Sequence, residues 1–117
     1  MASAALRSRP LIAVLSSVPL FLEAMTAAFE GIADVASISA DNQHAQGLLR
    51  AYNPNAAIVE GCEPGIVDGA VPCVRVDLAT QEVSLRRNGA WTAYEVELSP
   101  EAIRNVAVAA LYGGDAA

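Results

Sequence analysis

Four polar side chains stand where predicted strands end: Ser16, Ser17, Glu60 and Asp77. The runs before them are mostly apolar, and the first is a continuous apolar run, which is typical of a parallel strand buried on both faces. Because the carboxyl ends of parallel strands lie at one edge of a sheet, where ligands bind, we expect these side chains to line one pocket. Hydroxyl groups there can donate hydrogen bonds to a small anionic ligand, although capping of the following helix already explains one serine.

Two thiols and one imidazole are the other reactive groups. Cys62 and Cys73 flank a loop and can pair, but two cysteines without a convincing export signal are more often free thiols. His44 does not stand at a zinc-ligand spacing from them, and no nucleophile or oxyanion motif accompanies Cys62. A general base at Glu60 or Asp77 would likewise lack a second catalytic group. We therefore predict no metal site, no cofactor and no enzymatic activity.

The first half of the chain predicts the elements that bring the strand ends together. Ser17 is expected to cap a helix that Pro19 opens, because a proline in the first turn loses no hydrogen bond, and Gly31 is expected to end that helix. A second strand, a helix capped by Asp41 or Asn42 and a third strand follow. The order β-α-β-α-β indicates a parallel sheet with right-handed crossovers. The expected strands are 11–15, 34–39 and 56–60, and the second helix is expected over 43–52.

The segment 61–72 interrupts this alternation. It holds three glycines and two prolines, which are too many helix breakers for more than a short helical turn, and it leads into a strand over 73–77. The third crossover helix is therefore expected to be weak or missing, and one face of the sheet to be thinly covered.

The dipeptide Asn88-Gly89 predicts a type I′ hairpin, for which it is the strongest short-range signal. Pairing across this turn sets Arg86 opposite Trp91 on one face of the hairpin. An antiparallel hairpin is therefore expected after the parallel strands. Its strands are expected over 82–87 and 90–96, with Val83 opposite Tyr94 and Leu85 opposite Thr92 on the other face.

A final helix is expected from Pro100 to about Tyr112, capped by Ser99 and stopped by Gly113. Its apolar residues recur at helical spacing and should face the sheet. Small and polar residues at both ends of the chain predict loose tails. The expected organisation is a tail over 1–9, one α/β domain over 10–112 and a tail over 113–117.

The charge of the chain limits its partners. It contains seven Arg, no Lys and thirteen Asp plus Glu, for a formal net charge of −6. Nucleic-acid phosphates need clustered cations, so we expect no direct nucleic-acid binding, and a basic protein surface fits the charge better. No run approaches the roughly 20 apolar residues of a membrane span. The run after Arg7 and Arg9 lacks a clean cleavage site, so we expect no signal peptide and a cytoplasmic location.

The stretch 16–23, Ser-Ser-Val-Pro-Leu-Phe-Leu-Glu, resembles the start of the receiver domains of two-component response regulators, in the class that usually precedes a helix-turn-helix output domain. The stretch 53–60 is similar to the family's run into its phosphoacceptor strand, with Glu60 at the acceptor position. Pro64 lies four residues beyond Glu60, as the family's proline lies beyond its aspartate. The resemblance covers roughly residues 10–78 and implies a flavodoxin-like, three-layer α/β sandwich, here with a weakened third crossover helix and a C-terminal antiparallel hairpin.

The chain departs from this family at the residues that carry its chemistry. In the family, two acids after the first strand and the acceptor aspartate hold Mg²⁺, whereas Ser16, Ser17 and Glu60 stand at those positions here. No lysine exists to contact a phosphoryl group, and the hairpin after Asp77 replaces the family's further helices and parallel strand. We therefore expect no phosphotransfer. Glu60 can be a fixed mimic of a phosphorylated acceptor or can simply end its strand in solvent.

These observations favour a degenerate receiver-like regulatory domain that acts on signalling or transcription through a protein partner, with a homodimer as the expected assembly. The candidate contact residues are Arg86, Trp91 and Tyr94, because an exposed aromatic side chain next to an arginine is typical of an interface anchor. Packing of Trp91 against the last helix is the other interpretation of that residue. The edge of the hairpin is also a place where two copies could extend one sheet. The alternative function is a small-molecule sensor whose pocket lies at the strand ends.

Overall fold

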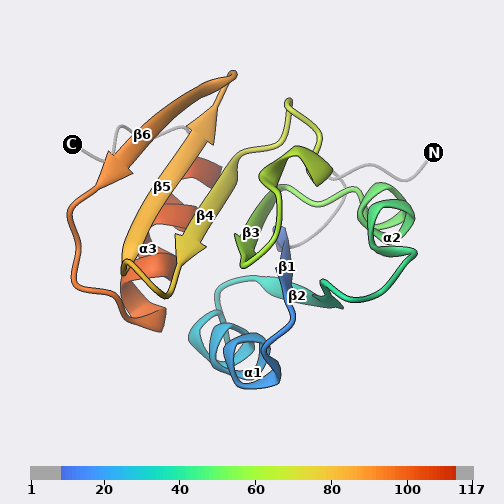
Figure 1. Ribbon diagram of the computed structural model, residues 1–117, viewed down its shortest axis with the longest axis horizontal. Helices are drawn as coiled ribbons and strands as arrows, with labels where there is room; N and C mark the ends of the chain where they lie inside the picture. The colour runs from blue at the N-terminus through green and yellow to red at the C-terminus, as the bar shows by residue number, and fades with distance from the viewer. Residues whose placement is uncertain (1–8, 113–117) are drawn as a thin grey trace.

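One six-stranded sheet with helices on both faces makes up residues 9–112, the part of the chain that this computed structural model describes (Figure 1). The strands are β1 (Leu11–Ser16), β2 (Asp34–Ser39), β3 (Ala56–Glu60), β4 (Cys73–Asp77), β5 (Glu82–Arg87) and β6 (Ala90–Tyr94). The helices are α1 (Pro19–Ala28), α2 (Ala45–Tyr52), the single 3₁₀ turn η2 (Pro64–Ile66) and α3 (Pro100–Leu111). The sheet order is β2-β1-β3-β4-β5-β6. Strands β1 to β4 are parallel and β5 and β6 are antiparallel, so the predicted α/β class and the C-terminal hairpin are confirmed.

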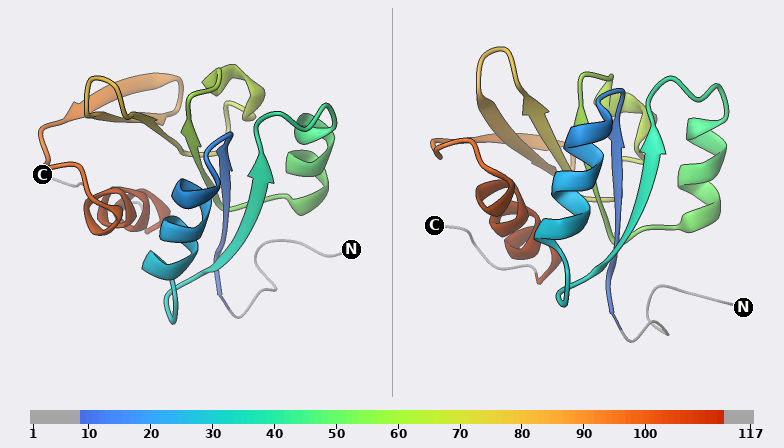
Figure 2. Two further views of the ribbon diagram at one scale, coloured as in Figure 1. Left: turned by 60° about the horizontal axis from the view of Figure 1, so that its bottom comes forward. Right: turned by 90° about the horizontal axis from the view of Figure 1, so that it is seen from below.

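Strand β1 lies inside the parallel part of the sheet, between β2 and β3. Its side chains alternate between two cores, because successive residues of a strand point to opposite faces. Ile12 and Val14 join the core under α1 and α3, whereas Ala13 and Leu15 join the core under α2. Figure 2 shows α1 and α3 side by side on one face and α2 across the sheet. Helices on both faces explain why this strand is apolar without interruption.

The start of α1 differs from the sequence prediction. Ser17 is exposed and does not cap the helix; the residue before Pro19 is Val18, which makes no side-chain cap. Instead, the N–H of Val18 donates to Oγ of the buried Ser16 at 2.9 Å. The prediction for Ser17 is wrong because the turn out of β1 directs the other serine to the backbone. After α1, Gly31 adopts φ 80° in the turn that leads into β2.

Helix α2 is two residues shorter at its start than predicted. Oδ1 of Asn42 accepts the N–H of His44 at 2.8 Å, so a side-chain turn precedes the helix, which begins at Ala45. Asn53 ends it in the left-handed region, at φ 47°. Leu49 and Ala45 are buried in one core with residues of β1, β2 and β3, which holds this helix to its face of the sheet.

The third crossover is reduced to η2, as predicted. Between β3 and β4 the chain makes one 3₁₀ turn and no α-helix. In consequence, Figure 1 shows α3 behind β4 and β5 and no helix in front of them. Arg75, Trp91 and Ala93 are therefore exposed on this front side, which we call the outer face of β4, β5 and β6.

The hairpin has the predicted turn and register. Asn88 and Gly89 both have positive φ, 53° and 81°, as a type I′ turn requires. Arg86 pairs with Trp91, and the other two predicted pairs are also present. However, β6 ends at Tyr94 rather than at residue 96, because the chain then leaves the sheet and packs Val96 and Leu98 against the core under α3.

Helix α3 closes the same face as α1. Oγ of Ser99 accepts the N–H of Ala102 at 3.0 Å, which confirms the predicted cap. Arg104 donates to the carbonyl of Ala28 at 3.4 Å and so links α3 to α1. Gly113, the rest of the predicted tail 113–117 and residues 1–8 of the predicted tail 1–9 lie outside the described residues. None of the helices within residues 9–112 is long and apolar enough to cross a membrane. The side chains of α3 that are buried against the sheet are Ile103, Val106, Ala107 and Ala110.

The two serines near helix starts should respond differently to mutation. Ser99→Ala removes a hydrogen-bonded cap and should lower the free energy of unfolding by about 1 kcal/mol. Ser17→Ala is the matched control, because Ser17 is exposed and makes no cap, and it should change stability by less than about 0.5 kcal/mol. Urea titrations followed by circular dichroism measure both. Equal losses in the two variants would contradict the assignment of the caps.

Candidate functional site

Ser16 and Glu60 meet at the carboxyl ends of β1 and β3. In the parallel register Leu15 pairs with Val59, so the next residue of each strand lies at the same level. The Ser16 hydroxyl donates to Oε1 of Glu60 at 2.5 Å and accepts the N–H of Val18 at 2.9 Å. Ser16 is 0% exposed and Glu60 8% exposed, and within the described residues they are the two buried polar side chains. This hydrogen-bonded pair is the centre of the candidate site.

The pair determines what Glu60 can do. A buried carboxylate needs hydrogen-bond partners, because an unsatisfied buried charge costs several kcal/mol. The hydroxyl of Ser16 supplies a donor, and its own oxygen is engaged by the backbone of the turn. The interpretation that Glu60 ends its strand in solvent is therefore wrong. Its carboxylate is held inside the edge of the sheet by a neutral group.

The other two predicted pocket residues have different roles. Ser17 points to solvent. Asp77 ends β4, and its Oδ1 accepts the N–H groups of Ala79 at 3.0 Å and of Thr80 at 3.2 Å. Donation by Thr80 lowers the pKa of Asp77 from its ordinary value, and Ala79 and the cation of Arg75 lower it further. The structure thus joins Ser16 to Glu60 by a hydrogen bond and uses Asp77 to hold the turn between β4 and β5, and Glu60 and Asp77 also line one cavity.

A cavity of about 530 Å³ lies at this edge of the sheet, between the ends of β3 and β4. Three carboxylates line it, those of Glu60, Glu63 and Asp77, together with the guanidinium of Arg75. We did not predict Arg75 and Glu63 as site residues, although Arg75 stands two residues from Asp77 on one face of its strand. Within residues 9–112 no group of three or more His, Cys, Asp or Glu could hold a metal ion. The cavity is polar, mostly negative and open to solvent.

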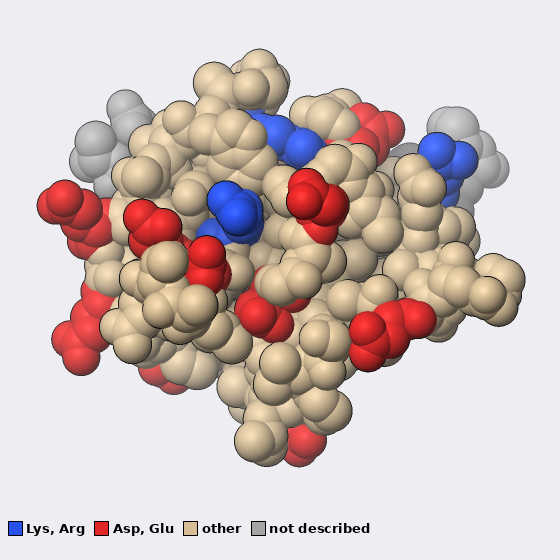
Figure 3. Space-filling model, in the orientation of Figure 1, with Lys and Arg blue, Asp and Glu red and all other residues tan. Residues whose placement is uncertain are grey.

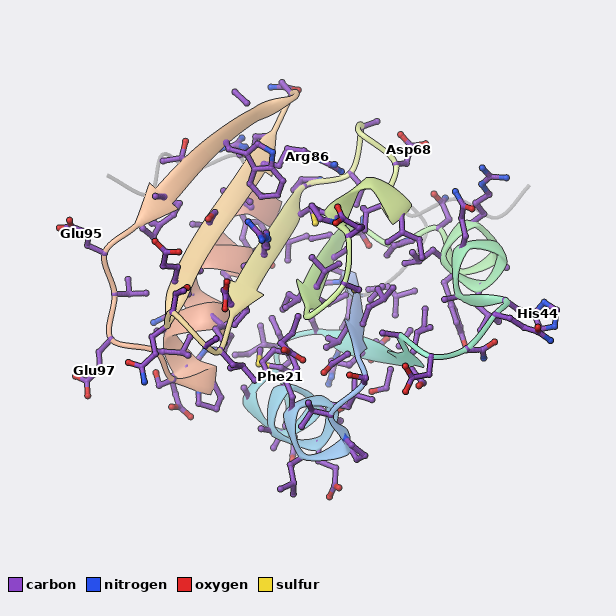
Figure 4. All side chains as sticks on the ribbon, in the orientation of Figure 1. Phe21, His44, Asp68, Arg86, Glu95 and Glu97 are labelled. Atoms are coloured by element: carbon purple, nitrogen blue, oxygen red, sulfur yellow. The ribbon has the colours of Figure 1, made fainter. Side chains whose placement is uncertain are left out.

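The thiols and the imidazole do not form a catalytic group. Both cysteines are free, Cys62 half-buried at the cavity and Cys73 buried in the sheet. Burial raises the pKa of the Cys73 thiol to about 11, and burial together with the charge of Glu60 raises the pKa of Cys62. Neither thiol is therefore activated as a thiolate. His44 is exposed at the start of α2, and Figure 4 shows its side chain pointing into solvent.

Arg86 attaches the loop between β3 and β4 to the sheet. Its guanidinium donates to the backbone carbonyls of Pro64 at 3.3 Å, Val67 at 3.0 Å and Asp68 at 3.1 Å. Figure 4 shows Arg86 on β5 beside this loop, which carries Asp68. The side chain of Arg86 thus holds this loop, which stands in place of a crossover helix, against the sheet. Arg86, predicted to contact a partner, has a large part of its hydrogen-bonding capacity engaged within the chain.

The hairpin aromatics lie on two different faces. Trp91 is 44% exposed on the outer face, and the Cζ atom of Arg86 lies 5.8 Å from the centre of its ring. Tyr94 is half-buried and packs against the core under α3. Packing of Trp91 against the last helix is therefore not observed. Of the three candidate contact residues, Trp91 is the one that is exposed, whereas Arg86 and Tyr94 are half-buried.

A second cavity lies on the α2 side of the sheet, between α2 and the loop after η2, and has a volume of about 430 Å³. Its floor includes the buried side chains of Leu49 and Val67, and Arg50 and Asp68 are among its polar lining. We did not predict this cavity, since it arises where a short 3₁₀ turn replaces a helix.

Comparisons of the chain with family models, with curated proteins and with solved structures found no match. The chemistry of the site therefore has to be argued from its own geometry. That geometry defines an α/β domain with a buried serine–carboxylate pair at the strand ends and an uncovered outer face.

Removal of the Ser16 hydroxyl tests the central pair. Ser16→Ala leaves the Glu60 carboxylate without this donor and the Val18 N–H without its acceptor, so the free energy of unfolding should fall by about 1–3 kcal/mol. Ser39 pairs with Ser16 in the register of β1 and β2 but is exposed, which makes Ser39→Ala a matched control with an expected change below about 0.5 kcal/mol. Urea unfolding gives both values. Ser16→Ala with wild-type stability would refute the role of this hydrogen bond.

Proposed function

We propose that this chain is a receiver-like regulatory domain that does not accept a phosphoryl group and acts by binding protein. The observation that carries the proposal is the hydrogen bond between Ser16 and Glu60. A phosphoacceptor carboxylate needs a nearby Mg²⁺ held by other carboxylates. Glu60 instead faces a neutral hydroxyl in a buried position, where one of its oxygens already accepts a hydrogen bond.

The topology supports this proposal. Strands β2-β1-β3-β4 follow the first four positions of the flavodoxin-like order 2-1-3-4-5, with α1 and α2 on opposite faces. Ser16 and Glu60 lie at the carboxyl ends of neighbouring strands, where ligands and switch groups sit in such sheets. The antiparallel hairpin β5–β6 stands where a further parallel strand and its crossovers would follow. We therefore assign the flavodoxin-like, receiver-like layout to the parallel half of the sheet.

The charge distribution supports the loss of phosphotransfer. The chain has no lysine, so a lysine contact to a phosphoryl group is impossible. Arg75 lines the cavity between β3 and β4 together with three acidic residues, Glu60, Glu63 and Asp77. An incoming phosphate would meet three negative charges there for one positive charge. The two free thiols fit the reducing conditions of the cytoplasm, where we place this domain.

The outer face is the proposed protein-binding surface, and a homodimer is the proposed assembly. Exposed Trp91 stands on Arg86, whose guanidinium is fixed by the loop carbonyls, so the ring is held in place before a partner arrives. A large aromatic side chain that is held in place and exposed on an uncovered sheet face is typical of an interface anchor. Two copies can bury this face against one another without disturbing either core.

Incubation with acetyl phosphate and Mg²⁺ tests the loss of phosphotransfer. Because Glu60 is buried against a hydroxyl and no acidic metal site is present among the described residues, the intact mass should not change. Glu60→Gln serves as the control for modification elsewhere on the chain. A gain of one phosphoryl group in the wild type that disappears in this variant would overturn the proposal.

Light scattering tests the proposed dimer. Trp91→Ala should weaken self-association by about 30-fold or more, the effect of losing a 2 kcal/mol anchor, and should yield monomers at concentrations where the wild type is dimeric. Tyr112→Ala is the control, because Tyr112 is also an exposed aromatic residue, 71% exposed, but lies at the end of α3. Circular dichroism should show both variants folded. Equal masses for the wild type and Trp91→Ala would remove the assignment of Trp91.

The cavity between β3 and β4 favours a second candidate, a sensor that binds a small molecule at the strand ends. Its volume of about 530 Å³ suits a small ligand, and the surplus of carboxylates selects a cationic one. A ligand of the folded state raises the melting temperature by mass action. Such a ligand would act at Glu60 and Asp77 and would leave the outer face free.

A further inference from the structure

Strand β6 is an unprotected edge of the sheet. It pairs with β5 and with no other strand that the structure describes. Its residues, Ala-Trp-Thr-Ala-Tyr over 90–94, include no charge and no proline and are rich in β-forming side chains. Proteins usually protect an exposed edge with charges, prolines or bulges, because its free backbone groups can pair with another chain. These devices are missing from β6 itself.

The register shows which backbone groups are available. In a two-residue hairpin the pair next to the turn, here Arg87 with Ala90, exchanges two hydrogen bonds. Along the two strands, hydrogen-bonded pairs then alternate with pairs that are not hydrogen-bonded. Thr92 therefore uses its N–H and C=O toward β5. Trp91 and Ala93 belong to the intervening pairs, so their N–H and C=O groups point away from β5. These groups can receive a further strand.

The opposite edge of the sheet differs from β6. Strand β2 begins with Asp34, which forms an ion pair with Arg9 at 4.0 Å. The hydroxyl groups of Ser37 and Thr26 lie 3.4 Å apart, which ties the middle of β2 to α1. Strand β2 thus carries an ion-paired charge and a polar contact to α1. The contrast identifies β6 as the edge that is open to pairing.

Acidic side chains surround the end of β6. Glu95 and Glu97 follow it directly and are exposed, and Figure 4 shows both pointing away from the sheet. Glu82 precedes Val83, which pairs with Tyr94, so Glu82 lies at the level of Glu95. On its other side Glu82 pairs with Asp77. Figure 3 shows acidic groups along this margin of the molecule, with the basic ones closer to the middle of the face. A strand that pairs here meets a negative field at the carboxyl end of β6.

We infer that the β6 edge binds an extended segment of a protein partner that carries Lys or Arg at its amino-terminal end, added as an antiparallel strand. Antiparallel pairing places that end of the segment beside Glu95 and Glu97 and lets Trp91 and Ala93 form its backbone hydrogen bonds. A second copy of this chain fits less well than a basic segment, because it adds a further net charge of −6 to the complex. The inference rests on the protein-binding half of the proposed function and names the chemistry of the partner.

A pair of synthetic peptides tests this edge. The probe Ac-Lys-Thr-Lys-Val-Thr-Val-Thr-NH₂ has the expected charge and β-propensity, and the control carries Glu in place of both Lys. Trp91 is the single tryptophan of the chain and lies on β6, so its fluorescence reports binding in a titration. The Lys peptide should bind and the Glu peptide should bind at least about tenfold more weakly, since like charges then face one another. Equal affinity for both peptides would overturn the inference.

Variants of β6 test the backbone contacts. Ala93→Pro removes an N–H that β5 does not use, so the protein should stay folded by circular dichroism and lose at least about tenfold in affinity for the Lys peptide. Thr92→Pro is the control for the register, because it removes a hydrogen bond to Leu85 and should disrupt the hairpin itself. Undiminished binding by Ala93→Pro would refute pairing at this edge.

Variants of the two glutamates test the charge. The double variant Glu95→Gln/Glu97→Gln should bind the Lys peptide about three- to tenfold more weakly and with less salt dependence, as expected for exposed ion pairs. Glu23→Gln/Glu30→Gln makes the same change in net charge on and just after α1 and should bind like the wild type. Equal loss in both double variants would show that net charge alone matters and would overturn the site.

The outcomes separate this inference from the proposed function. No binding of the Lys peptide, with an unchanged mass after acetyl phosphate treatment, overturns the edge site and leaves the regulatory proposal standing. Binding of the Lys peptide together with a gain of one phosphoryl group supports the edge site and overturns the proposed loss of phosphotransfer. If Ala93→Pro, and not Trp91→Ala, dissociates a dimer of the protein in light scattering, a second copy occupies the edge and the basic partner is refuted.

Discussion

The hydrogen bond between Ser16 and Glu60 is the constraint on which the site depends. The Glu60 carboxylate is only 8% exposed, and the hydroxyl of Ser16 supplies the hydrogen bond that a buried carboxylate needs. The parallel register of β1 and β3 places these two groups at the same level of the sheet. Oγ of Ser16 also accepts the N–H of Val18, so this one atom is bonded both to the turn into α1 and to the carboxylate at the end of β3. A change of register by one residue would point both groups to the other face of the sheet. The fold and the proposed loss of phosphotransfer therefore rest on the same contact.

The missing crossover helix explains the surface of the molecule. Where a helix would cover the sheet, a loop with one 3₁₀ turn is held by Arg86 through backbone carbonyls, including that of Val67. This arrangement covers part of the face, fixes Arg86 beneath Trp91 and leaves the rest of the outer face to solvent. The antiparallel hairpin tolerates this exposure, because such strands need only one buried face. One local departure from β-α-β alternation thus produces both the exposed aromatic residue and the open edge of β6.

Much of the fold could be predicted from local signals. Apolar runs, breakers and the Asn88-Gly89 turn predicted the order of the strands and the hairpin register correctly, since each depends on neighbouring residues alone. The cap of α1 could not be predicted, because Ser16 and Ser17 are equal candidates until the turn selects one. The end of β6 was placed two residues too late, since alternation continues through Val96 while the chain has already turned toward α3. Likewise, the role of Arg86 depends on a loop some twenty residues away.

The α/β class, the polar residues at the strand ends, the hairpin pairs and the acidic charge without lysine all follow from the amino-acid sequence, because periodicity, turn chemistry and composition are properties of short segments. Only the assembled fold shows that Glu60 is buried and bonded to Ser16, that Asp77 holds the turn after its own strand, and that Arg86 holds the loop between β3 and β4. These outcomes depend on which strands become neighbours and on what covers each face. Burial is a property of the assembled sheet, so no single segment of the chain contains it.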